Sequence, residues 1–188
     1  MKSKKKPIKA LIMGCLLFFS CNILLTQEYV VEGGKAFFKA KMPLNSYTGE
    51  SNELKGKVNF ETGLLEFSVL VKSIKTGIEK RDAHMYELLK ANENPNVIFK
   101  GKFIENYNPT VKTKQVLQVK GNFTLAETTR EVIIDIELTF EGKAIRLTSS
   151  WNLMITEYHI ERPSKFFFKV DDKHELEVNI LLEKEKMD

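Results

Sequence analysis

Cysteine, tryptophan and histidine are scarce in this chain of 188 residues, which contains two, one and three of them respectively. Both cysteines, Cys15 and Cys21, lie within the first 27 residues. The rest of the chain therefore has no thiol that could form a disulfide, attack a substrate or bind a metal ion. A domain built from residues 28–188 must be stabilised by its own hydrophobic core, and the chain is 43% hydrophobic, with 13 phenylalanines.

The sequence also lacks the residue patterns of the common catalytic and metal sites. None of His84, His159 and His174 stands two to four residues from another histidine or cysteine, so no zinc-binding spacing exists. There is no nucleophile elbow, phosphate-binding loop or dinucleotide-binding glycine motif. The adjacent carboxylates Asp171 and Asp172 lie in a predicted turn, where Asp side chains commonly bond to the backbone. We therefore expect no metal, no cofactor and no enzymatic activity.

A surplus of one charge sign is missing from most of the chain, although the formal net charge is +4. Five lysines lie in the first 27 residues, which contain no Asp or Glu, so residues 28–188 carry 24 basic and 25 acidic side chains. Nucleic-acid binding requires a concentration of Lys and Arg that neutralises phosphates. The balanced charge of residues 28–188 therefore excludes nucleic acid as an expected partner.

The first 27 residues have the pattern of a segment for export. Lysines dominate the first nine positions and the following run is almost wholly apolar, as in a secretory signal peptide. A retained membrane helix is the less favoured interpretation, because polar residues 20–22 interrupt the run and further polar residues follow it. We predict cleavage near Gln27 and an exported protein in the periplasm or outside the cell. The Phe-Phe-Ser-Cys sequence ending at Cys21 resembles a degenerate lipoprotein signal, so the alternative is a membrane-anchored lipoprotein lipidated on Cys21.

Residues 28–188 show the alternation of polar and apolar side chains that is typical of β-strands. In one such run Leu65, Phe67 and Val69 alternate with Glu66 and Ser68. Turn-forming Gly, Asn, Pro and Asp residues separate the runs. We expect a single all-β domain of about eight antiparallel strands, which must close or stack to cover their apolar faces and edges. The clearest alternating runs are residues 35–42, 57–61, 64–74, 116–125, 131–140, 147–155 and 176–182.

One segment departs from this alternation. Residues 79–91 place apolar side chains at helical spacing and end before Pro95, and the residue before a proline disfavours helix. We predict one short helix there, inserted between strands 3 and 4. Eight strands with one apolar face each can close into a barrel or stack as a two-layer sandwich. The long runs at residues 64–74 and 116–125 favour the barrel, because they exceed the usual length of about five to six residues.

Several motifs resemble those of the YceI-like family, the exported bacterial polyisoprenoid-binding proteins with a lipocalin-like barrel. They are Ser-Ile-Lys-Thr-Gly at residues 73–77, Arg-Asp-Ala-His at residues 81–84 and Pro-Asn-Val-Ile-Phe at residues 95–99. Tyr158-His159-Ile160 stands where the family has an aromatic residue, a glycine and an isoleucine. The resemblance extends over residues 29–183 and implies an eight-stranded antiparallel lipocalin-like barrel.

The resemblance implies a carrier that holds a polyisoprenoid, or the chain of an isoprenoid quinone, inside the barrel and performs no chemistry on it. Such a long-chain lipid is then the expected partner, and peripheral contact with a membrane is part of that expectation. The alternative is a cell-surface structural or interaction module without a small ligand, because the same apolar residues could fill the barrel completely. The sequence leaves the oligomeric state open, a dimer included. The apolar residues that we expect to line a tunnel are Phe38, Phe60, Phe67, Val69, Phe99, Phe103, Phe123, Leu125, Ile134, Ile136, Trp151 and Leu153.

The Arg-Asp-Ala-His motif has two interpretations. Asp82 lies at the start of the predicted helix, where the helix dipole favours a negative charge, and Arg81 can pair with it or with a loop carbonyl. This predicts a structural corner between strand and helix, formed by Arg81, Asp82 and His84. The other interpretation is that these three side chains contact the head group of a ligand.

Overall fold

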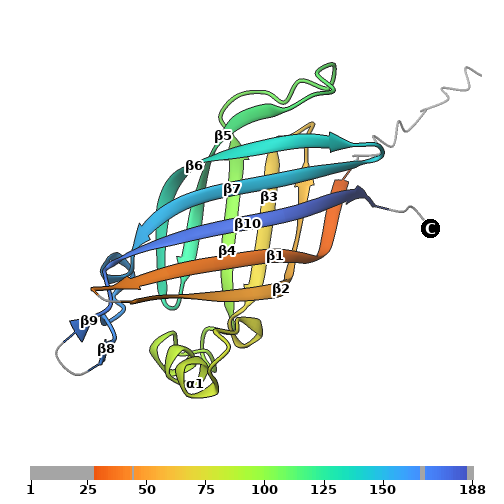
Figure 1. Cartoon of the computed structure of the whole chain (residues 1–188). Helices are drawn as coiled ribbons and strands as arrows, with labels where there is room; N and C mark the ends of the chain where they lie inside the picture. Colours follow the sequence, from red (N-terminus) through yellow and green to blue (C-terminus); the bar gives the residue numbers. More distant parts are fainter. Residues whose placement is uncertain (1–27, 44, 166–167, 186–188) are drawn as a thin grey trace, which may run out of the picture.

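Eight antiparallel strands form a closed barrel (Figure 1). The computed structural model describes residues 28–43, 45–165 and 168–185, and the strands follow one another around the barrel in the order β1-β10-β7-β6-β5-β4-β3-β2. The predicted all-β barrel is therefore confirmed, and the two-layer sandwich is wrong. The barrel strands are β1 (Glu28–Met42), β2 (Asn45–Asn59), β3 (Leu64–Leu70), β4 (Asn96–Phe103), β5 (Gln115–Leu125), β6 (Thr128–Glu141), β7 (Ala144–Met154) and β10 (Lys173–Lys184).

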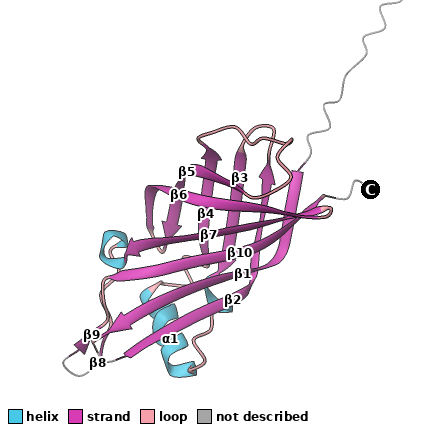
Figure 2. Cartoon of the chain, turned by 45° about the horizontal axis from the view of Figure 1, so that its top comes forward, coloured by secondary structure: helices cyan, strands magenta, loops and turns pink. Residues whose placement is uncertain are grey.

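The other elements are short and gather toward one end of the barrel (Figures 1 and 2). The predicted helix is confirmed as α1 (Glu79–Leu88), which lies between β3 and β4. Two 3-10 helices, η1 (Val71–Ser73) and η2 (Ile155–Tyr158), follow β3 and β7, and β8 (Ser164–Lys165) pairs with β9 (Phe168–Lys169) in a separate two-stranded sheet. Within residues 28–43, 45–165 and 168–185, no helix is long and apolar enough to cross a membrane.

Side chains alternate between the interior and the solvent along the barrel strands. In β6, Ile134, Ile136 and Leu138 are buried, whereas Glu131 and Asp135 are exposed. A one-residue shift of the strand would place the charged residues inside and the apolar ones outside. The alternation therefore determines which face of each strand forms the interior.

Most strands extend a few residues beyond the predicted runs, and β1 begins seven residues earlier, at Glu28 rather than residue 35. Three further differences have a local physical reason. β2 begins at Asn45, whereas the alternation predicted only residues 57–61. The first part was missed because the pairing with β1 shifts irregularly beside Gly34 and interrupts the alternation. The interior positions before that shift include Gly49 and Ser51, which give no hydrophobic signal. β3 ends at Leu70, and the chain turns into η1. α1 ends at Leu88 rather than residue 91, because Lys90 has a φ of 49°, which a right-handed helix does not allow.

Candidate ligand-binding cavity

The barrel contains a cavity of about 930 Å³. Its wall is formed mainly by aliphatic and aromatic side chains, and all eight barrel strands contribute to it. The solvent-exposed residues Ile78, Lys80 and His84 also line the cavity, so it reaches the solvent beside α1. We call this open end the mouth. Small-molecule pockets usually measure about 300–1,000 Å³, so this cavity is large enough for a sizeable ligand.

Most of the residues that were predicted to line a tunnel lie in the wall of this cavity. Phe60 and Phe103 do not. The ten that do are Phe38, Phe67, Val69, Phe99, Phe123, Leu125, Ile134, Ile136, Trp151 and Leu153.

Phe60 and Phe103 instead belong to an aromatic cluster that fills the opposite end of the barrel. The Phe60 ring lies 5.8 Å from Phe103, 4.4 Å from Tyr107 and 5.2 Å from Tyr29, and Tyr107 lies 6.3 Å from Phe140, measured between ring centroids. We call these five residues the aromatic plug. The barrel is thus hollow toward the mouth and filled toward the plug. The sequence could not distinguish the two halves, because apolar residues alternate with polar ones in the same way whether they line a cavity or pack in a filled core.

Two phenylalanine–glycine pairs keep the wall of the cavity flat. Phe38 faces Gly49 across β1 and β2, and Phe67 faces Gly56 across β2 and β3. A Cβ atom on Gly49 would overlap the Phe38 ring, and one on Gly56 would overlap the Phe67 ring and the backbone of β3. Each ring therefore lies against the backbone of the neighbouring strand instead of projecting across the barrel. Apolar periodicity alone missed these glycines, since only strand register brings each one opposite a phenylalanine.

Asp82 stabilises the corner between β3 and α1. Its side chain is 6% exposed, and its carboxylate accepts hydrogen bonds from the Thr76 backbone N–H (2.8 Å) and the Thr76 hydroxyl (2.5 Å). This geometry fits the structural interpretation of the residue. The expected pairing of Arg81 with Asp82 or a loop carbonyl is not what the structure shows. The Arg81 guanidinium lies 4.3 Å from the centroid of the Tyr47 ring instead.

Arg81 and His84 both line the mouth of the cavity, whereas Asp82 does not. The motif of residues 81–84 is therefore divided between two roles. Asp82 bonds to the turn before the helix, and its two neighbours face the entrance. The spacing of the motif could not reveal this division, because it depends on the orientation of α1 relative to β2.

His174 was not among the predicted site residues, yet it lines the cavity. Its ring stacks on Phe38 with centroids 6.0 Å apart. Burial lowers the pKa of His174, and the nearby carboxylate of Asp172 only partly opposes this effect. The ring is therefore neutral at pH 7, which suits an apolar wall. Its position beside a predicted turn made it resemble a surface histidine in the sequence.

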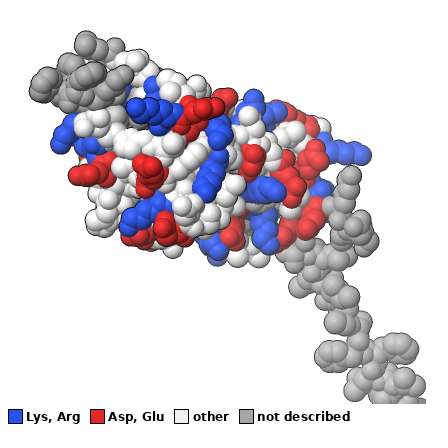
Figure 3. Space-filling view, turned by 90° about the horizontal axis from the view of Figure 1, so that it is seen from below, with Lys and Arg blue, Asp and Glu red and all other residues white. Residues whose placement is uncertain are grey.

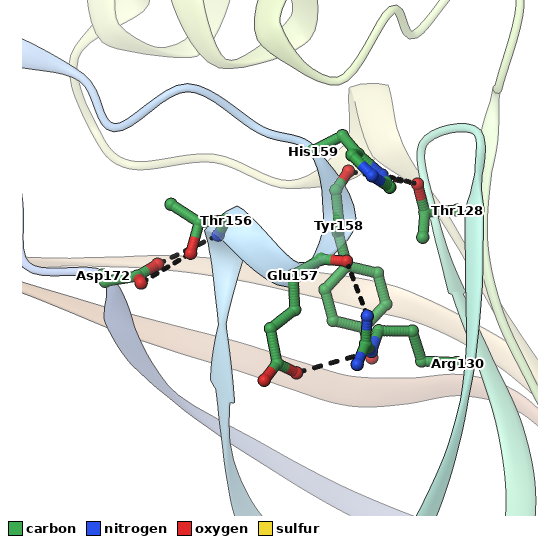
Figure 4. Close-up of polar contacts among 7 residues, drawn as sticks. All are labelled: Thr128, Arg130, Thr156, Glu157, Tyr158, His159 and Asp172. Carbon is green, nitrogen blue, oxygen red and sulfur yellow. Dashed lines mark hydrogen bonds and ion pairs between the residues drawn. The ribbon is translucent and has the colours of Figure 1, made fainter.

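A second Asp–Thr contact holds η2 beside the mouth (Figure 4). Asp172 accepts hydrogen bonds from the Thr156 hydroxyl (2.6 Å) and the Thr156 backbone N–H (2.9 Å). The hydroxyl bond is the main reason that the pKa of Asp172 lies below its ordinary value. Arg130 donates to the Glu157 carbonyl (3.2 Å) and pairs with the Glu157 carboxylate (3.4 Å). Asp172 thus bonds to the backbone, as the turn prediction expected, and Ile155 of the same 3-10 helix is fixed in the cavity wall.

His159 ends η2 in a left-handed conformation with φ 57°. Its Nδ1 lies 3.0 Å from the Thr128 hydroxyl (Figure 4). Glycine adopts this conformation without strain, which explains physically why a glycine suits this turn. In this chain the contact with Thr128 stabilises a histidine in that conformation, so His159 serves to end η2.

The comparisons with known proteins agree with this architecture. A model of the YceI-like domain matches residues 29–182, which is most of the chain. The chain belongs to the YceI-like family. No curated protein matches the chain by sequence.

Solved structures with a similar fold match the chain at low sequence identity. A polyisoprenoid binding domain from Saccharophagus degradans is 10% identical, with a TM-score of 0.70 over 84% of this chain and 98% of that chain. BcnA of Burkholderia cenocepacia is 11% identical, with a TM-score of 0.66 over 79% and 95% of the two chains. A YCEI protein of Campylobacter jejuni is 14% identical, with a TM-score of 0.53 over the full length of both. At these identities the likeness shows the fold alone.

Charged residues are sparse inside this YceI-like cavity. Lys80, Arg81 and Glu87 lie at the mouth on α1, and Glu177 in the lining is exposed. In the part of the chain that the structure describes, no group of three or more His, Cys, Asp or Glu side chains could hold a metal ion. On the face seen in Figure 3, from the side where α1 lies, Lys and Arg alternate with Asp and Glu and leave uncharged surface between them. The cavity is therefore suited to an apolar ligand with its polar end at the mouth.

Proposed function

We propose that this YceI-like protein binds the chain of a polyisoprenoid lipid or isoprenoid quinone in its barrel and carries it without chemical change. The observation that supports this proposal most directly is the cavity of about 930 Å³ with its wall of aliphatic and aromatic residues. The description of the Saccharophagus degradans relative as a polyisoprenoid binding domain points to the same ligand class. The chain would enter at the mouth, and its polar end would stay beside Arg81 and His84.

The energetics favour a long chain over a small apolar molecule. Burying one isoprene unit of five carbons contributes roughly 4 kcal/mol, at about 0.8 kcal/mol for each carbon. Ordering a flexible chain offsets much of this gain, so tight binding requires several units in contact with the wall. Specificity for chemical detail should be low, because apolar contacts discriminate a single methylene by only about 1–3 kcal/mol.

The proposal predicts that a large side chain in the cavity wall abolishes binding. Delipidated protein should take up a radiolabelled polyprenyl alcohol to saturation at one site. Ile134→Trp and Val69→Trp each fill part of the cavity and should weaken uptake by about 100-fold or more, which corresponds to about 2.7 kcal/mol. Ile133→Trp and Leu70→Trp are the matched controls, because these neighbours face the solvent with 58% and 42% of their surface exposed. Both controls should bind like the unaltered protein.

Thermal melting of each variant separates loss of binding from loss of folding. If delipidated wild-type protein shows no saturable uptake of any polyprenyl compound, the carrier proposal is wrong, and a structural or interaction module becomes the better interpretation. If mass spectrometry instead detects a new product formed from the lipid, the protein is an enzyme. Lys143→Ala, in the exposed turn between β6 and β7, provides a further control that should change neither uptake nor melting.

We also propose that the protein works outside the cytoplasm, in the periplasm or beyond, and contacts membranes only peripherally. The support is the basic and then apolar pattern of residues 1–27, which lie outside the described residues. The intact mass of protein recovered from its own host should correspond to a chain that begins near Gln27. A diacylated mass starting at Cys21 would establish the lipoprotein instead, and a mass that includes Met1 would contradict export by cleavage.

A further inference from the structure

The barrel changes from hollow to filled at one layer of interior side chains. Ile136 on β6, Leu147 on β7 and Ile180 on β10 line the cavity. The next interior residue toward the plug on each of these strands is Leu138, Ile145 and Leu182, and none of these three lines it. Their side chains are 0%, 3% and 0% exposed. We call Leu138, Ile145 and Leu182 the floor of the cavity.

The floor residues lie next to one another, and no residue of the aromatic plug beyond them lines the cavity. Leu182 faces Ile145 directly across β10 and β7, and Leu138 faces Leu147 across β6 and β7. Cross-strand neighbours on one face of a sheet lie in contact, so these residues form one patch. Behind the floor the rings of the aromatic plug pack on one another, and Phe140 follows Leu138 on the same face of β6. A chain that enters at the mouth must therefore stop at the floor.

The orientation of the ligand follows from the two ends of the cavity. Charged and solvent-exposed residues surround the mouth, whereas every floor residue is aliphatic. A polar head group would lose its hydration without a partner at the floor. The apolar tail of the chain therefore points toward Leu138, Ile145 and Leu182, and its length decides whether it fits.

We propose that the floor sets the number of isoprene units that the barrel can enclose. This inference rests on the proposed function. If each carbon occupies close to the roughly 30 Å³ of a water molecule in the liquid, the cavity encloses about 30 carbon atoms, or about six isoprene units. Additional isoprene units remain in water at the mouth, so they bury no further apolar surface and do not raise the affinity.

The experiment measures the affinity of delipidated protein for a series of all-trans prenyl alcohols of increasing length. In the wild type, affinity should rise with each added unit and level off at about six units. The double variant Leu138→Ala/Leu182→Ala removes six carbons from the floor, so its plateau should shift to a chain about one unit longer. Ile180→Phe adds three carbons just above the floor and should shift the plateau to a shorter chain.

Leu181→Phe is the matched control for Ile180→Phe, because Leu181 lies next to it on the outer face of β10 with 36% of its surface exposed. Its length profile should match the wild type. The proposal is overturned if wild-type affinity does not depend on chain length, or if Ile180→Phe binds with an unchanged plateau. Should the double variant fail to fold, the plateau of Ile180→Phe by itself tests the proposal. Absence of any binding by the wild type would contradict the proposed function, a result distinct from a length profile that floor variants do not alter.

Discussion

Replacing Gly56 by alanine should abolish the stable fold of this barrel. A Cβ atom at this position would overlap the Glu66 carbonyl oxygen and the Phe67 ring, and would lie 2.9 Å from the Phe67 Cα. Two of these obstacles belong to the backbone of β3, so no side-chain rotation can relieve them. We expect a loss of more than about 4 kcal/mol in the free energy of unfolding, the range reserved for severe defects of the core.

The position of Gly56 makes the barrel especially sensitive to this change. β2 and β3 pair through only four residue pairs, and Gly56–Phe67 is one of the inner two. Separating the strands there would open the barrel along that seam and expose the unpaired backbone. The substitution would therefore disrupt the closure of the whole barrel. Repacking of the Phe67 ring alone could not compensate for the separated strands.

Urea unfolding followed by the fluorescence of Trp151, the only tryptophan of the chain, measures this effect. Gly142→Ala is the control, because Gly142 has a φ of 64° and a Cβ atom there would meet no described residue within 4 Å. That variant should lose only about 1 kcal/mol from backbone strain. If the unfolding transition of Gly56→Ala lies close to that of Gly142→Ala, the prediction is wrong, and β2 and β3 can move apart without a large loss in the free energy of unfolding.

Replacing Asp82 by alanine should destabilise the protein by about 2 to 3 kcal/mol, since a buried carboxylate and two hydrogen bonds are lost together. The Thr76 N–H and hydroxyl would be left without the acceptor that they now share. The turn before α1 would loosen, and with it the elements that border the mouth. Asp82→Asn keeps one acceptor oxygen and should lose about half as much.

Arg81→Ala distinguishes a structural corner from a ligand contact. The contact of Arg81 with Tyr47 is partly exposed, so its loss should lower the free energy of unfolding by only about 0.5–1 kcal/mol. Thermal melting and polyprenyl uptake should be measured on Arg81→Ala and on Asp82→Ala. Asp82→Ala with unchanged melting but no uptake would refute the structural role of Asp82 and favour a head-group contact.

Much of this architecture could be predicted from the sequence, because alternation is a local property of each strand. The runs that contain Leu65, Phe67 and Val69, or Ile134 and Ile136, are buried on the predicted faces. The break in alternation at residues 79–91 marked α1 correctly apart from its end. The start of β2 was missed, because a pairing irregularity and the residues Gly49 and Ser51 removed the hydrophobic signal.

The placement of individual site residues depended on contacts between distant strands. Phe60 and Phe103 have the same pattern as Phe67 and Phe99, yet the first two pack in the plug and the second two line the cavity. His174 enters the wall because β10 pairs with β7 and β1, which no local pattern indicates. The division of the Arg-Asp-Ala-His motif follows from where α1 lies relative to Tyr47.

By itself, the sequence determined that this protein is an all-β domain with one inserted helix, since local alternation and turn residues specify strands and their inward faces. It favoured a barrel over a sandwich, and the closed strand order of the structure decided between them. The tertiary structure alone decided that the barrel is hollow. Whether interior side chains meet or leave a space depends on which residues face one another across strands, as Phe38 faces Gly49 and Phe67 faces Gly56. The partners in each pair are not neighbours in the sequence, and only the register of the closed sheet brings each ring against a bare backbone and keeps the centre of the barrel open.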